Sequence, residues 1–369
     1  MKATTSRISS FTAMLAVATL PFLAPHAVQA AELKQIATIA VPGDALSSFD
    51  ISFVDSASHR YFLADRTNKG VDVFDTVTNT YVGRIAGFVG AVMKNGKVDG
   101  NKSGPDGIHV IGNEIWAGDG DSTLKVVDLK TMKITETVST GGTTRLDEMS
   151  YDPKNKVFIG VNNAEEPPYA TLVSTKAGHK VIGKTLFPDA TDGAEQPDWN
   201  KADGLFYVAI PQMGKDVTKG GVAVIDPKTA KLIKTIPVDN CHPNGLAFGP
   251  GQNFLLGCAA RGKDGMPPIA VIMNAGTGKV VATIPELGGA DMVAYSAKNG
   301  EYYFGGGNNP GGGVLGVIDA KTNKLVQKIA MKGGSTPHSV AVDDKTGHVF
   351  VPGGGGDGGC SCIMVFAKQ

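Results

Sequence analysis

Short apolar runs, each introduced by one polar residue, recur at similar intervals along the chain. Successive polar residues of this kind lie 56, 41, 51, 46, 47 and 47 positions apart, a mean of 288/6 = 48. A period of this size is typical of an array of small β-sheets, with one sheet per repeat. The seven residues are Asp50, Asp106, Asp147, Asp198, Asn244, Asp291 and His338.

A second repeated pattern marks the hairpins inside the repeats. An apolar pair followed by Asp or Asn, as in Val224-Ile225-Asp226, usually precedes a Thr by two or three residues. Polar and apolar residues then alternate, for example over 231–236 and 324–329. Alternation with period two indicates half-buried strands, and the Asp-x-x-Thr segment has the composition of the turn between two of them.

The repeats predict a ring of blades. The first six contain four strands each, whereas the seventh, 337–366, contains only three before the chain ends. The alternating segment 33–41 can supply the missing strand, and this pairing would close the ring and remove exposed edges. We therefore predict an all-β fold, a seven-bladed β-propeller whose last blade is completed by the N-terminal strand. The first six repeats are 50–85, 105–138, 147–186, 197–236, 243–284 and 290–329.

The N-terminus has the layout of a secretory signal peptide. Lys2 and Arg7 precede an apolar stretch over 11–24, and small residues lead to Ala30. This stretch has 24 − 11 + 1 = 14 residues, whereas a membrane-spanning helix needs about 20. We expect a signal peptide over 1–30, one propeller domain over 31–369, no membrane span, and a periplasmic or secreted protein.

The net charge of the chain limits the kinds of partner that the protein is expected to bind. Without Lys2 and Arg7, the 35 basic residues become 33 against 35 acidic ones, a net charge of about −2. The absence of a basic block argues against nucleic acid, which is bound through phosphate contacts. A closed propeller also has no edge strand that requires a second subunit. We therefore expect a monomer that binds a small molecule or a protein at its axial face.

Several segments resemble the YVTN-repeat, or YncE-like, family of periplasmic propellers. They are the Val-Ile-Asp-x-x-Thr turns, the strand end Thr-Ile-Pro-Val over 235–238, and the segments 243–250 and 337–342. The resemblance covers essentially the whole mature chain and implies the propeller fold. It implies no particular activity, because a propeller is a scaffold whose function lies in its site.

In a propeller, the loops that lead into the inner strands surround the axial opening. We expect the seven repeat-leading residues to meet there, beside Glu148 and the arginines Arg66, Arg145 and Arg261, which would pair with carboxylates or contact a ligand. In one interpretation each polar residue only caps its own turn. In the other, the seven side chains bind a divalent cation, for which Ca²⁺ fits oxygen donors better than Zn²⁺ or Cu²⁺.

The segment 243–248, Pro-Asn-Gly-Leu-Ala-Phe, is similar to one in gluconolactonase-type (senescence-marker) propellers. In that family the matching Asn, here Asn244, is a divalent-cation ligand. Those propellers are usually six-bladed, and their N-terminal Glu-Gly-Pro ligand motif has no match at 49–51. The resemblance implies an alternative function, a metal-dependent hydrolase or lyase in which His242 or His338 is the general base.

The four cysteines are also expected on the axial face. Cys241 precedes an inner strand and Cys258 ends the next one, so antiparallel pairing would bring them together as a disulfide in an oxidising compartment. Cys360 and Cys362 are separated by one residue. That spacing leaves three possibilities: a local disulfide, a redox-labile pair, and a soft-metal site.

Overall fold

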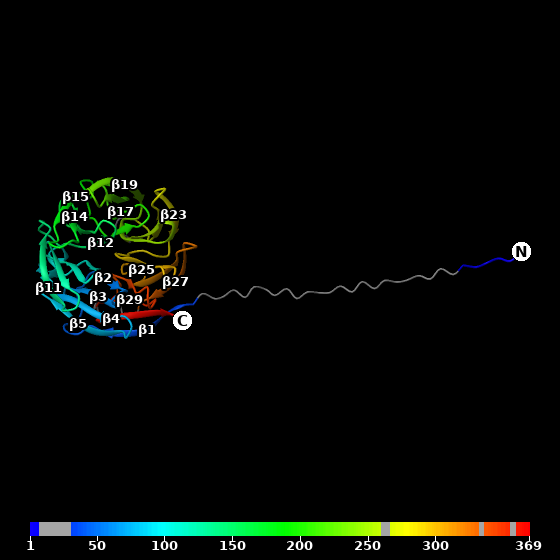
Figure 1. Ribbon diagram of the computed structural model, residues 1–369, viewed down its shortest axis with the longest axis horizontal. Helices are drawn as coiled ribbons and strands as arrows, with labels where there is room; N and C mark the ends of the chain where they lie inside the picture. Colours follow the sequence, from blue (N-terminus) through cyan, green and yellow to red (C-terminus); the bar gives the residue numbers. More distant parts are fainter. Residues whose placement is uncertain (7–30, 260–265, 332–335, 355–358) are drawn as a thin grey trace. The chain divides into compact units, whose positions relative to one another are not determined.

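The structure is a computed structural model that describes residues 1–6, 31–259, 266–331, 336–354 and 359–369. Met1–Ala31 is a unit separate from Glu32–Gln369, and the second unit contains all of the described strands. Its described residues form seven four-stranded antiparallel sheets arranged as the blades of a ring (Figure 1). The predicted seven-bladed β-propeller is confirmed. Most of the expected signal peptide, 7–30, lies outside the described residues.

Six blades are built in chain order, from the innermost strand to the outermost one. Blade 1 contains β2 (Ser52–Asp55), β3 (Arg60–Asp65), β4 (Gly70–Asp75) and β5 (Thr80–Ala86). Blade 2 contains β8 (Ile108–Ile111), β9 (Glu114–Gly118), β10 (Thr123–Asp128) and β11 (Lys133–Ser139). Blade 3 contains β12 (Met149–Asp152), β13 (Val157–Asn162), β14 (Tyr169–Ser174) and β15 (Val181–Leu186).

The next three blades repeat this order. Blade 4 contains β16 (Pro197–Asn200), β17 (Leu205–Ile210), β18 (Lys219–Asp226) and β19 (Lys231–Asp239). Blade 5 contains β20 (Pro243–Phe248), β21 (Asn253–Cys258), β22 (Ala270–Asn274) and β23 (Lys279–Ile284). Blade 6 contains β24 (Val293–Ser296), β25 (Glu301–Gly306), β26 (Val314–Asp319) and β27 (Lys324–Ala330).

Blade 7 joins the two ends of the chain. Its inner strands are β28 (Ala341–Val342), β29 (Val349–Gly353) and β30 (Cys362–Lys368), and its outermost strand is β1 (Leu33–Ala40). Leu33 pairs with Lys368 and Ala40 pairs with Cys362, so β1 covers the full edge of β30. The prediction that the N-terminal strand completes the last blade is confirmed.

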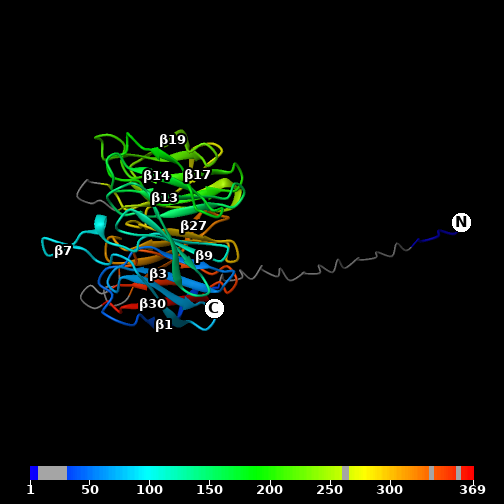
Figure 2. The same cartoon turned by 60° about the vertical axis from the view of Figure 1, so that its left-hand side comes forward.

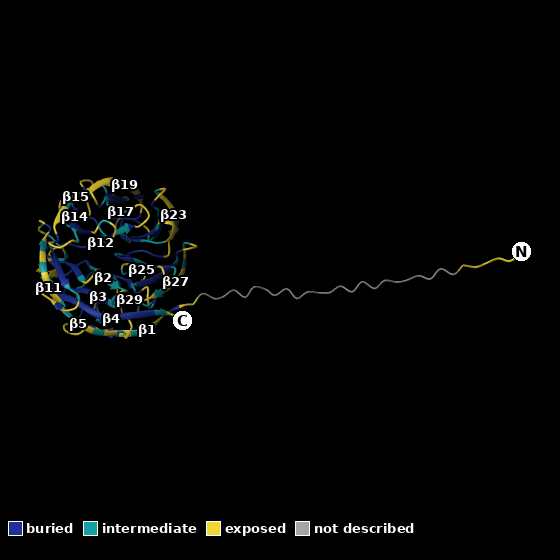
Figure 3. Ribbon diagram, viewed as in Figure 1, coloured by how far each residue is buried: buried dark blue, intermediate teal, exposed yellow. Residues whose placement is uncertain are grey.

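The core consists of apolar clusters that lie between neighbouring blades. Between blades 1 and 2, for example, Phe62 and Ile85 pack with Ile115, and all three are buried. The second and third strands of a blade are buried on both sides by this packing, whereas outer strands such as β11 alternate exposed and half-buried residues (Figure 3). The period-two pattern in the sequence therefore belongs to the outermost strands, because only they face solvent on one side.

The Asp-x-x-Thr segments form the turns that lead into the outermost strands. In the turns at Asp128, Asp226 and Asp319, for example, the Asp side chain accepts a hydrogen bond from a backbone N–H two or three residues further on. This is the turn geometry that favours Asp and Asn. The donors are Thr131 N to Asp128 (2.7 Å), Lys228 N to Asp226 (2.9 Å) and Thr322 N to Asp319 (2.7 Å).

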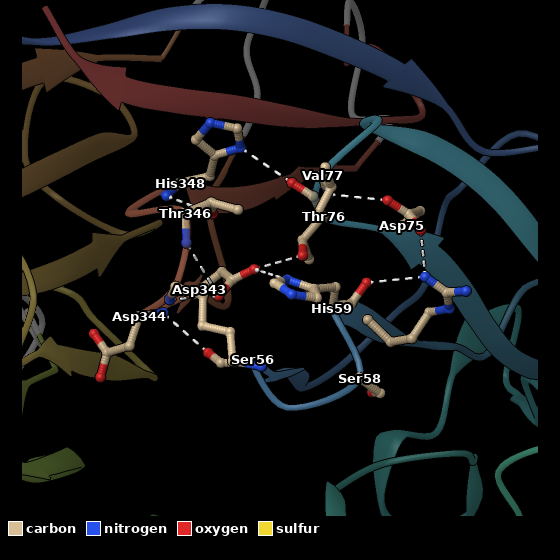
Figure 4. A network of polar contacts seen from close by, with 12 residues as sticks. Ser56, Ser58, His59, Asp75, Thr76, Val77, Asp343, Asp344, Thr346 and His348 are labelled. Atoms are coloured by element: carbon tan, nitrogen blue, oxygen red, sulfur yellow. Dashed lines mark hydrogen bonds and ion pairs between the residues drawn. The ribbon is translucent and has the colours of Figure 1, made fainter.

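Blades 7 and 1 are also joined by a polar network at the ends of the inner strands that lie away from Asp50 (Figure 4). Asp343, in the turn after β28, is fully buried. Its carboxylate accepts hydrogen bonds from Lys345 N in its own turn and from the Thr76 hydroxyl of blade 1. His59 Nδ1, also of blade 1, lies 3.5 Å from the same carboxylate. These contacts tie the first blade to the last, in addition to the β1–β30 pairing.

An insertion separates blades 1 and 2. It contains the two-stranded hairpin of β6 (Met93–Lys94) and β7 (Lys97–Val98) and the 3₁₀-helix η1 (Gly100–Lys102), and the hairpin projects from the body of the propeller in Figure 2. The insertion explains why the first spacing in the sequence is 56 residues rather than 48. A second 3₁₀-helix, η2 (Pro250–Gln252), lies in blade 5. Among the described residues, no helix has the length and apolar character to cross a membrane.

Candidate functional site at the axial opening

The position that leads into each inner strand is defined by one backbone hydrogen bond. In blades 1 to 4, the backbone N–H of the residue at this position donates a hydrogen bond to a carbonyl oxygen near the end of the second strand. This bond fixes the residue at the axial opening. We call the seven equivalent residues the axial ring. The bonds join Asp50 to Ala64 (2.9 Å), Asp106 to Gly118 (3.0 Å), Asp147 to Val161 (2.8 Å) and Glu195 to Ala209 (2.8 Å).

One predicted member of the ring is therefore misplaced. In blade 4 the ring position belongs to Glu195, whereas Asp198 lies three residues further on, within β16. The physical reason is the strand register, because Pro197 pairs with Val208 and the residue two positions earlier occupies the ring. The corrected spacings, 195 − 147 = 48 and 244 − 195 = 49, fit the period better than those with Asp198. The period alone could thus have found Glu195.

The other three predicted members lie at equivalent positions in blades 5 to 7. Asn244 and Asp291 each precede by two residues the strand pair that corresponds to Ser52 and Leu63 of blade 1. His338 is placed beside Asp50 by a direct contact of 2.9 Å between its Nε2 and a carboxylate oxygen. The axial ring is therefore Asp50, Asp106, Asp147, Glu195, Asn244, Asp291 and His338.

Two arginines, the buried Arg66 and the half-buried Arg145, neutralise one side of the ring. Arg66 forms ion pairs with both Asp50 and Asp106, and its Nε donates to Asp106 at 3.0 Å. Arg145 Nη2 lies 2.6 Å from Asp147, and its Nη1 lies 3.8 Å from Asp50. These two predicted residues thus contact the carboxylates rather than open solvent. The third predicted arginine, Arg261, lies outside the described residues.

His338 bridges the first and sixth blades. Its Nε2 lies 2.9 Å from Asp50 and 3.0 Å from Asp291. Burial alone would lower the pKa of His338, but the two carboxylates outweigh burial and raise this pKa to about 9. The imidazole is therefore positively charged near neutral pH and donates a proton to the carboxylates rather than accepting one.

The carboxyl groups of the ring share three cationic side chains, those of Arg66, Arg145 and His338. Burial would raise the pKa of Asp50, but Arg66, His338 and Arg145 together hold it well below its ordinary value. Burial raises the pKa of Asp147 to about 7 and that of Asp106 well above its usual range, and neighbouring carboxylates add to the effect. Protons are thus shared among coupled groups, as expected when like charges meet in a buried site.

Glu148, which follows Asp147, is the most isolated carboxyl group of the site. It is 2 % exposed, and neither of its oxygens has a hydrogen-bond partner among the described residues. Burial raises its pKa well above the ordinary value, and the charges of Asp291 and Glu195 raise it further. Glu195 behaves in the same way, since burial and the charge of Asp291 raise its pKa. A buried carboxyl group without a donor calls for a proton or a cation.

Asn244 adds a second buried oxygen that is not used within the chain. Its Nδ2 donates to Asp291 at 3.1 Å, which orients the amide, and its Oδ1 is buried without a partner among the described residues. The assignment of the amide follows from this hydrogen bond, because Asp291 can only accept when it is ionised. Asn244 therefore presents an acceptor oxygen to which no described residue donates.

Glu148 lines a cavity of about 250 Å³ that runs along the inner strands of all seven blades. Asp198 also lines this cavity, where its carboxylate accepts hydrogen bonds from Trp199 N at 2.7 Å and Phe248 N at 2.8 Å. Burial raises the pKa of Asp198 to about 6. Asp198 is thus held by its own strand and the next one, which matches the turn-capping interpretation for this residue alone.

Negative groups outnumber positive ones at the opening. Within the described residues, six carboxyl groups face three cationic side chains, and this excess of three favours a cationic ligand. Two sets of three donor groups lie within 4.8 Å of one another, but each already contains a cation or contacts one. The carboxyl groups are Asp50, Asp106, Asp147, Glu148, Glu195 and Asp291, and the cations are Arg66, Arg145 and His338.

His242, a predicted catalytic residue, lies away from the ring contacts. It is 4 % exposed, and its Nε2 lies 3.1 Å from the Asp192 carboxylate. It precedes the ring residue Asn244 by two positions, so it belongs to the loop behind the ring. The two predicted histidines are thus not brought together by any contact between described residues.

Comparisons with known proteins identify the fold. No protein-family model matches the chain, and no curated protein matches its sequence. Among solved structures, a chain of Kuenenia stuttgartiensis hydrazine synthase matches with a TM-score of 0.70 and 13 % identity, over 89 % of this chain and 97 % of that one. At this identity the likeness shows the propeller fold alone. The resemblance to the YVTN-repeat family stays a prediction.

Proposed function

We propose that the propeller is a periplasmic or secreted protein of the YVTN-repeat type that binds a divalent cation at its axial opening. One observation carries the proposal, namely the burial of Glu148 with two unpartnered oxygens in a site where carboxyl groups exceed cations. The predicted signal peptide and the buried disulfide Cys241–Cys258 support an oxidising compartment.

The proposed ligands belong to the ring side away from Arg66, in blades 3 to 6. They are the carboxyl groups of Glu148, Glu195 and Asp291, with the amide oxygen of Asn244. The three carboxyl groups do not all lie within 4.8 Å of one another, so their side chains must turn toward the cation, and water would complete the set. Asp50, Asp106 and Asp147 complete the negative field but are already paired with Arg66 and Arg145. A dication bound there would take the place of the protons that the raised pKa values of Glu148 and Glu195 otherwise retain.

Ca²⁺ matches this donor set best, because it takes six to eight oxygen ligands in flexible geometry. Zn²⁺ or Cu²⁺ would prefer a nitrogen donor, and the nearest candidate is His338. That imidazole holds a proton between Asp50 and Asp291, so a metal must displace the proton first. We therefore rank Ca²⁺ above the two transition metals.

The hydrolase or lyase alternative uses the same site. It needs a general base beside the cation, and a His338 that is protonated near neutral pH has the wrong charge for that role. Binding without turnover is therefore the function we propose, and lactone hydrolysis is an outcome that the experiment below includes.

The test is calorimetric titration of Ca²⁺, Mg²⁺ and Zn²⁺ into chelator-treated mature protein. We expect Ca²⁺ to bind one site, and Glu148→Gln or Glu195→Gln to weaken its affinity by about tenfold or more, since each removes one charged ligand. Asp198→Asn is the matched control, because it removes a carboxylate from the same cavity without touching the ring, and it should bind as the wild type does.

Two results would overturn the proposal. The first is the absence of heat and of thermal stabilisation with all three ions, because a ligand that binds only the folded state must stabilise it. The second is equal affinity in the wild type, Glu148→Gln and Glu195→Gln. Metal-dependent turnover of a lactone that disappears in Asn244→Ala would replace binding by the hydrolase alternative.

A further inference from the structure

The two disulfides of the chain differ in their exposure to solvent. Cys241 and Cys258 are separated by 17 positions, are each 1 % exposed, and join β20 to its neighbour β21. Cys360 and Cys362 are separated by only two positions. Cys362 is 2 % exposed, whereas Cys360, two residues before β30 begins, is exposed. Only the second disulfide contains a cysteine that is exposed to solvent, Cys360.

Stability does not account for the second disulfide. A disulfide stabilises a fold mainly by restricting the unfolded chain, and this effect grows with the length of the loop that it closes. The loop between Cys360 and Cys362 contains one residue, so the gain is the smallest available. Exposed disulfides are typically the labile, regulatory or catalytic ones.

The backbone holds these two cysteines together independently of the bond between them. Ser361 accepts two hydrogen bonds from the chain that leaves β1, one from Val41 N to its carbonyl at 3.0 Å and one from Leu46 N to its hydroxyl at 2.9 Å. Cys362 pairs with Gly353 in β29 and with Ala40 in β1. Two reduced thiols would therefore remain neighbours, which makes re-oxidation possible without rearrangement of the blade.

We propose that Cys360-Ser361-Cys362 is a thiol–disulfide exchange site that takes a dithiol as its substrate. A thiolate of the dithiol attacks Sγ of Cys360 from the solvent side, the bond to Cys362 breaks, and its electron pair stays on Sγ of Cys362, which takes a proton from water. The second thiolate attacks the substrate sulfur that is bonded to Cys360 and releases Cys360 as a thiolate. Two electrons are transferred, so the dithiol leaves as a disulfide and the propeller keeps two thiols.

The exchange site is linked to the axial ring by packing. Cys360 Sγ lies 3.9 Å from the carbonyl oxygen of Gly353. The next residue, Gly354, packs so closely on Phe49 that a Cβ there would lie 2.3 Å from the ring of Phe49. That ring meets His338 edge-on, with centroids 6.2 Å apart. The cysteine pair therefore lies on the same axial face as the ring, although the exchange chemistry needs no cation.

The first test measures the rate at which each disulfide is reduced. Oxidised mature protein is treated with dithiothreitol, quenched with a maleimide at intervals, and analysed by mass spectrometry while circular dichroism monitors the fold. We expect Cys360 and Cys362 to be labelled about tenfold faster or more than Cys241 and Cys258. Glu148→Gln should show the same rates, which separates this proposal from the cation site.

The second test identifies the attacked sulfur and measures turnover. With oxidised glutathione, Cys362→Ser should form a mixed disulfide at Cys360, and Cys360→Ser should react at the buried Cys362 about tenfold more slowly. Small amounts of wild-type protein should also accelerate the oxidation of a dithiol peptide by oxidised glutathione, and Cys360→Ser should not. Equal reduction of both disulfides, equal reaction of the two variants, or no acceleration would each overturn the proposal.

Discussion

A buried carboxyl group without a donor destabilises the protein that carries it, and Glu148 is in this position. The corresponding residues after the ring are Ile51 in blade 1 and Met292 in blade 6, so this position accepts apolar side chains. We predict that Glu148→Met raises the free energy of unfolding by about 1–3 kcal/mol in chelator, because the cost of an unpartnered buried group is removed. Urea unfolding with and without Ca²⁺ measures this gain.

Added Ca²⁺ should reverse the order of stability in that experiment. The wild type gains the free energy of cation binding, whereas Glu148→Met lacks a ligand. The control is Asp198→Asn, whose carboxylate oxygens already accept two backbone hydrogen bonds, so it should gain nothing in chelator. A Glu148→Met variant that is less stable than the wild type in chelator would show that Glu148 has a stabilising partner in solution.

Asp72 carries a separate pH dependence, away from the ring. Arg84 donates from Nε to Asp72 at 2.7 Å and from Nη2 to Asp65 at 3.1 Å, so two buried carboxyl groups share one guanidinium. Burial raises the pKa of Asp72 from 3.8 to about 7, against the hydrogen bonds from Arg84, and the charge of Asp65 adds to the rise. Asp72 therefore binds a proton more tightly in the folded state than in the unfolded state.

The sign of the effect on stability follows from linkage. A group whose pKa is raised by folding contributes stability that is complete below its unfolded pKa and is lost as the pH rises through its folded pKa. The wild type should thus lose stability relative to Asp72→Asn between about pH 4 and pH 7, and the difference should level off above about pH 8. Urea unfolding across this range measures it, and parallel pH profiles for the two proteins would contradict the prediction.

At the level of single residues, the sequence predicts which residues form the axial ring better than it predicts the contacts that their neighbours make. Six of the seven members follow from the period, but blade 4 offers Glu195 and Asp198 close together, and the choice depends on which residue pairs with Val208 across the hairpin. The isolation of Glu148 has no sequence signal. It depends on which side chains of other blades reach it, and in the same layer Gln196 finds partners in Leu246 and Val293 whereas Glu148 finds none in the part of the chain that the structure describes.

At the level of strands and turns, the alternating outer strands and the Asp turns are readable because each is a local pattern. The β6–β7 insertion is visible in the sequence only as a long first spacing, since two-residue strands have no periodicity to detect. The contacts of the turn between β28 and β29 with blade 1 were not predicted either. They join residues such as Thr76 and Asp343 that are 267 positions apart.

The stability contributed by the contacts between blades 7 and 1 can be measured by comparing Asp343 with Asp152, which lies in a similar turn. Asp343 and Asp152 are both fully buried and both accept backbone hydrogen bonds in their own turns, from Lys345 and Lys154 at 2.8 Å. Only Asp343 also accepts from Thr76 in another blade. We predict that Asp343→Ala lowers the free energy of unfolding by about 1–2 kcal/mol more than Asp152→Ala, because it also leaves a buried hydroxyl without a partner.

Chemical denaturation of both variants in the same buffer measures this difference. Thr76→Val provides a second control, since it removes the hydroxyl together with its need for an acceptor and should cost less than Asp343→Ala. Equal losses in Asp343→Ala and Asp152→Ala would mean that the contact between blades adds nothing to the turn, and that β1 alone closes the ring.

At the level of the whole molecule, the axial site exists only if the ring closes. Its first and last members, Asp50 and His338, are 338 − 50 = 288 residues apart in the sequence. In the folded chain, His338 Nε2 lies 2.9 Å from a carboxylate oxygen of Asp50. The contact between these two residues therefore requires a closed ring, because any opening between blades 7 and 1 separates them. Such a site could be anticipated from the repeat period, because equivalent positions of a closed ring must converge on its axis.

Strand β1 is the element that closes the ring, and its removal is the most direct test of closure. Deletion of 31–40 exposes the edge of β30 and removes two buried side chains, Leu33 and Ile39, whose burial is worth about 3–6 kcal/mol together. We predict a loss of stability of that order and association of the shortened protein through the free edge.

A synthetic peptide with the sequence of β1 should restore the thermal transition, because strand addition recovers both the backbone hydrogen bonds and the buried contacts. The same peptide with Leu33→Asp and Ile39→Asp should not. Unchanged stability and a monomeric state after the deletion would mean that blade 7 is complete with three strands, and that the ring is closed by contacts such as that of Asp343 with Thr76.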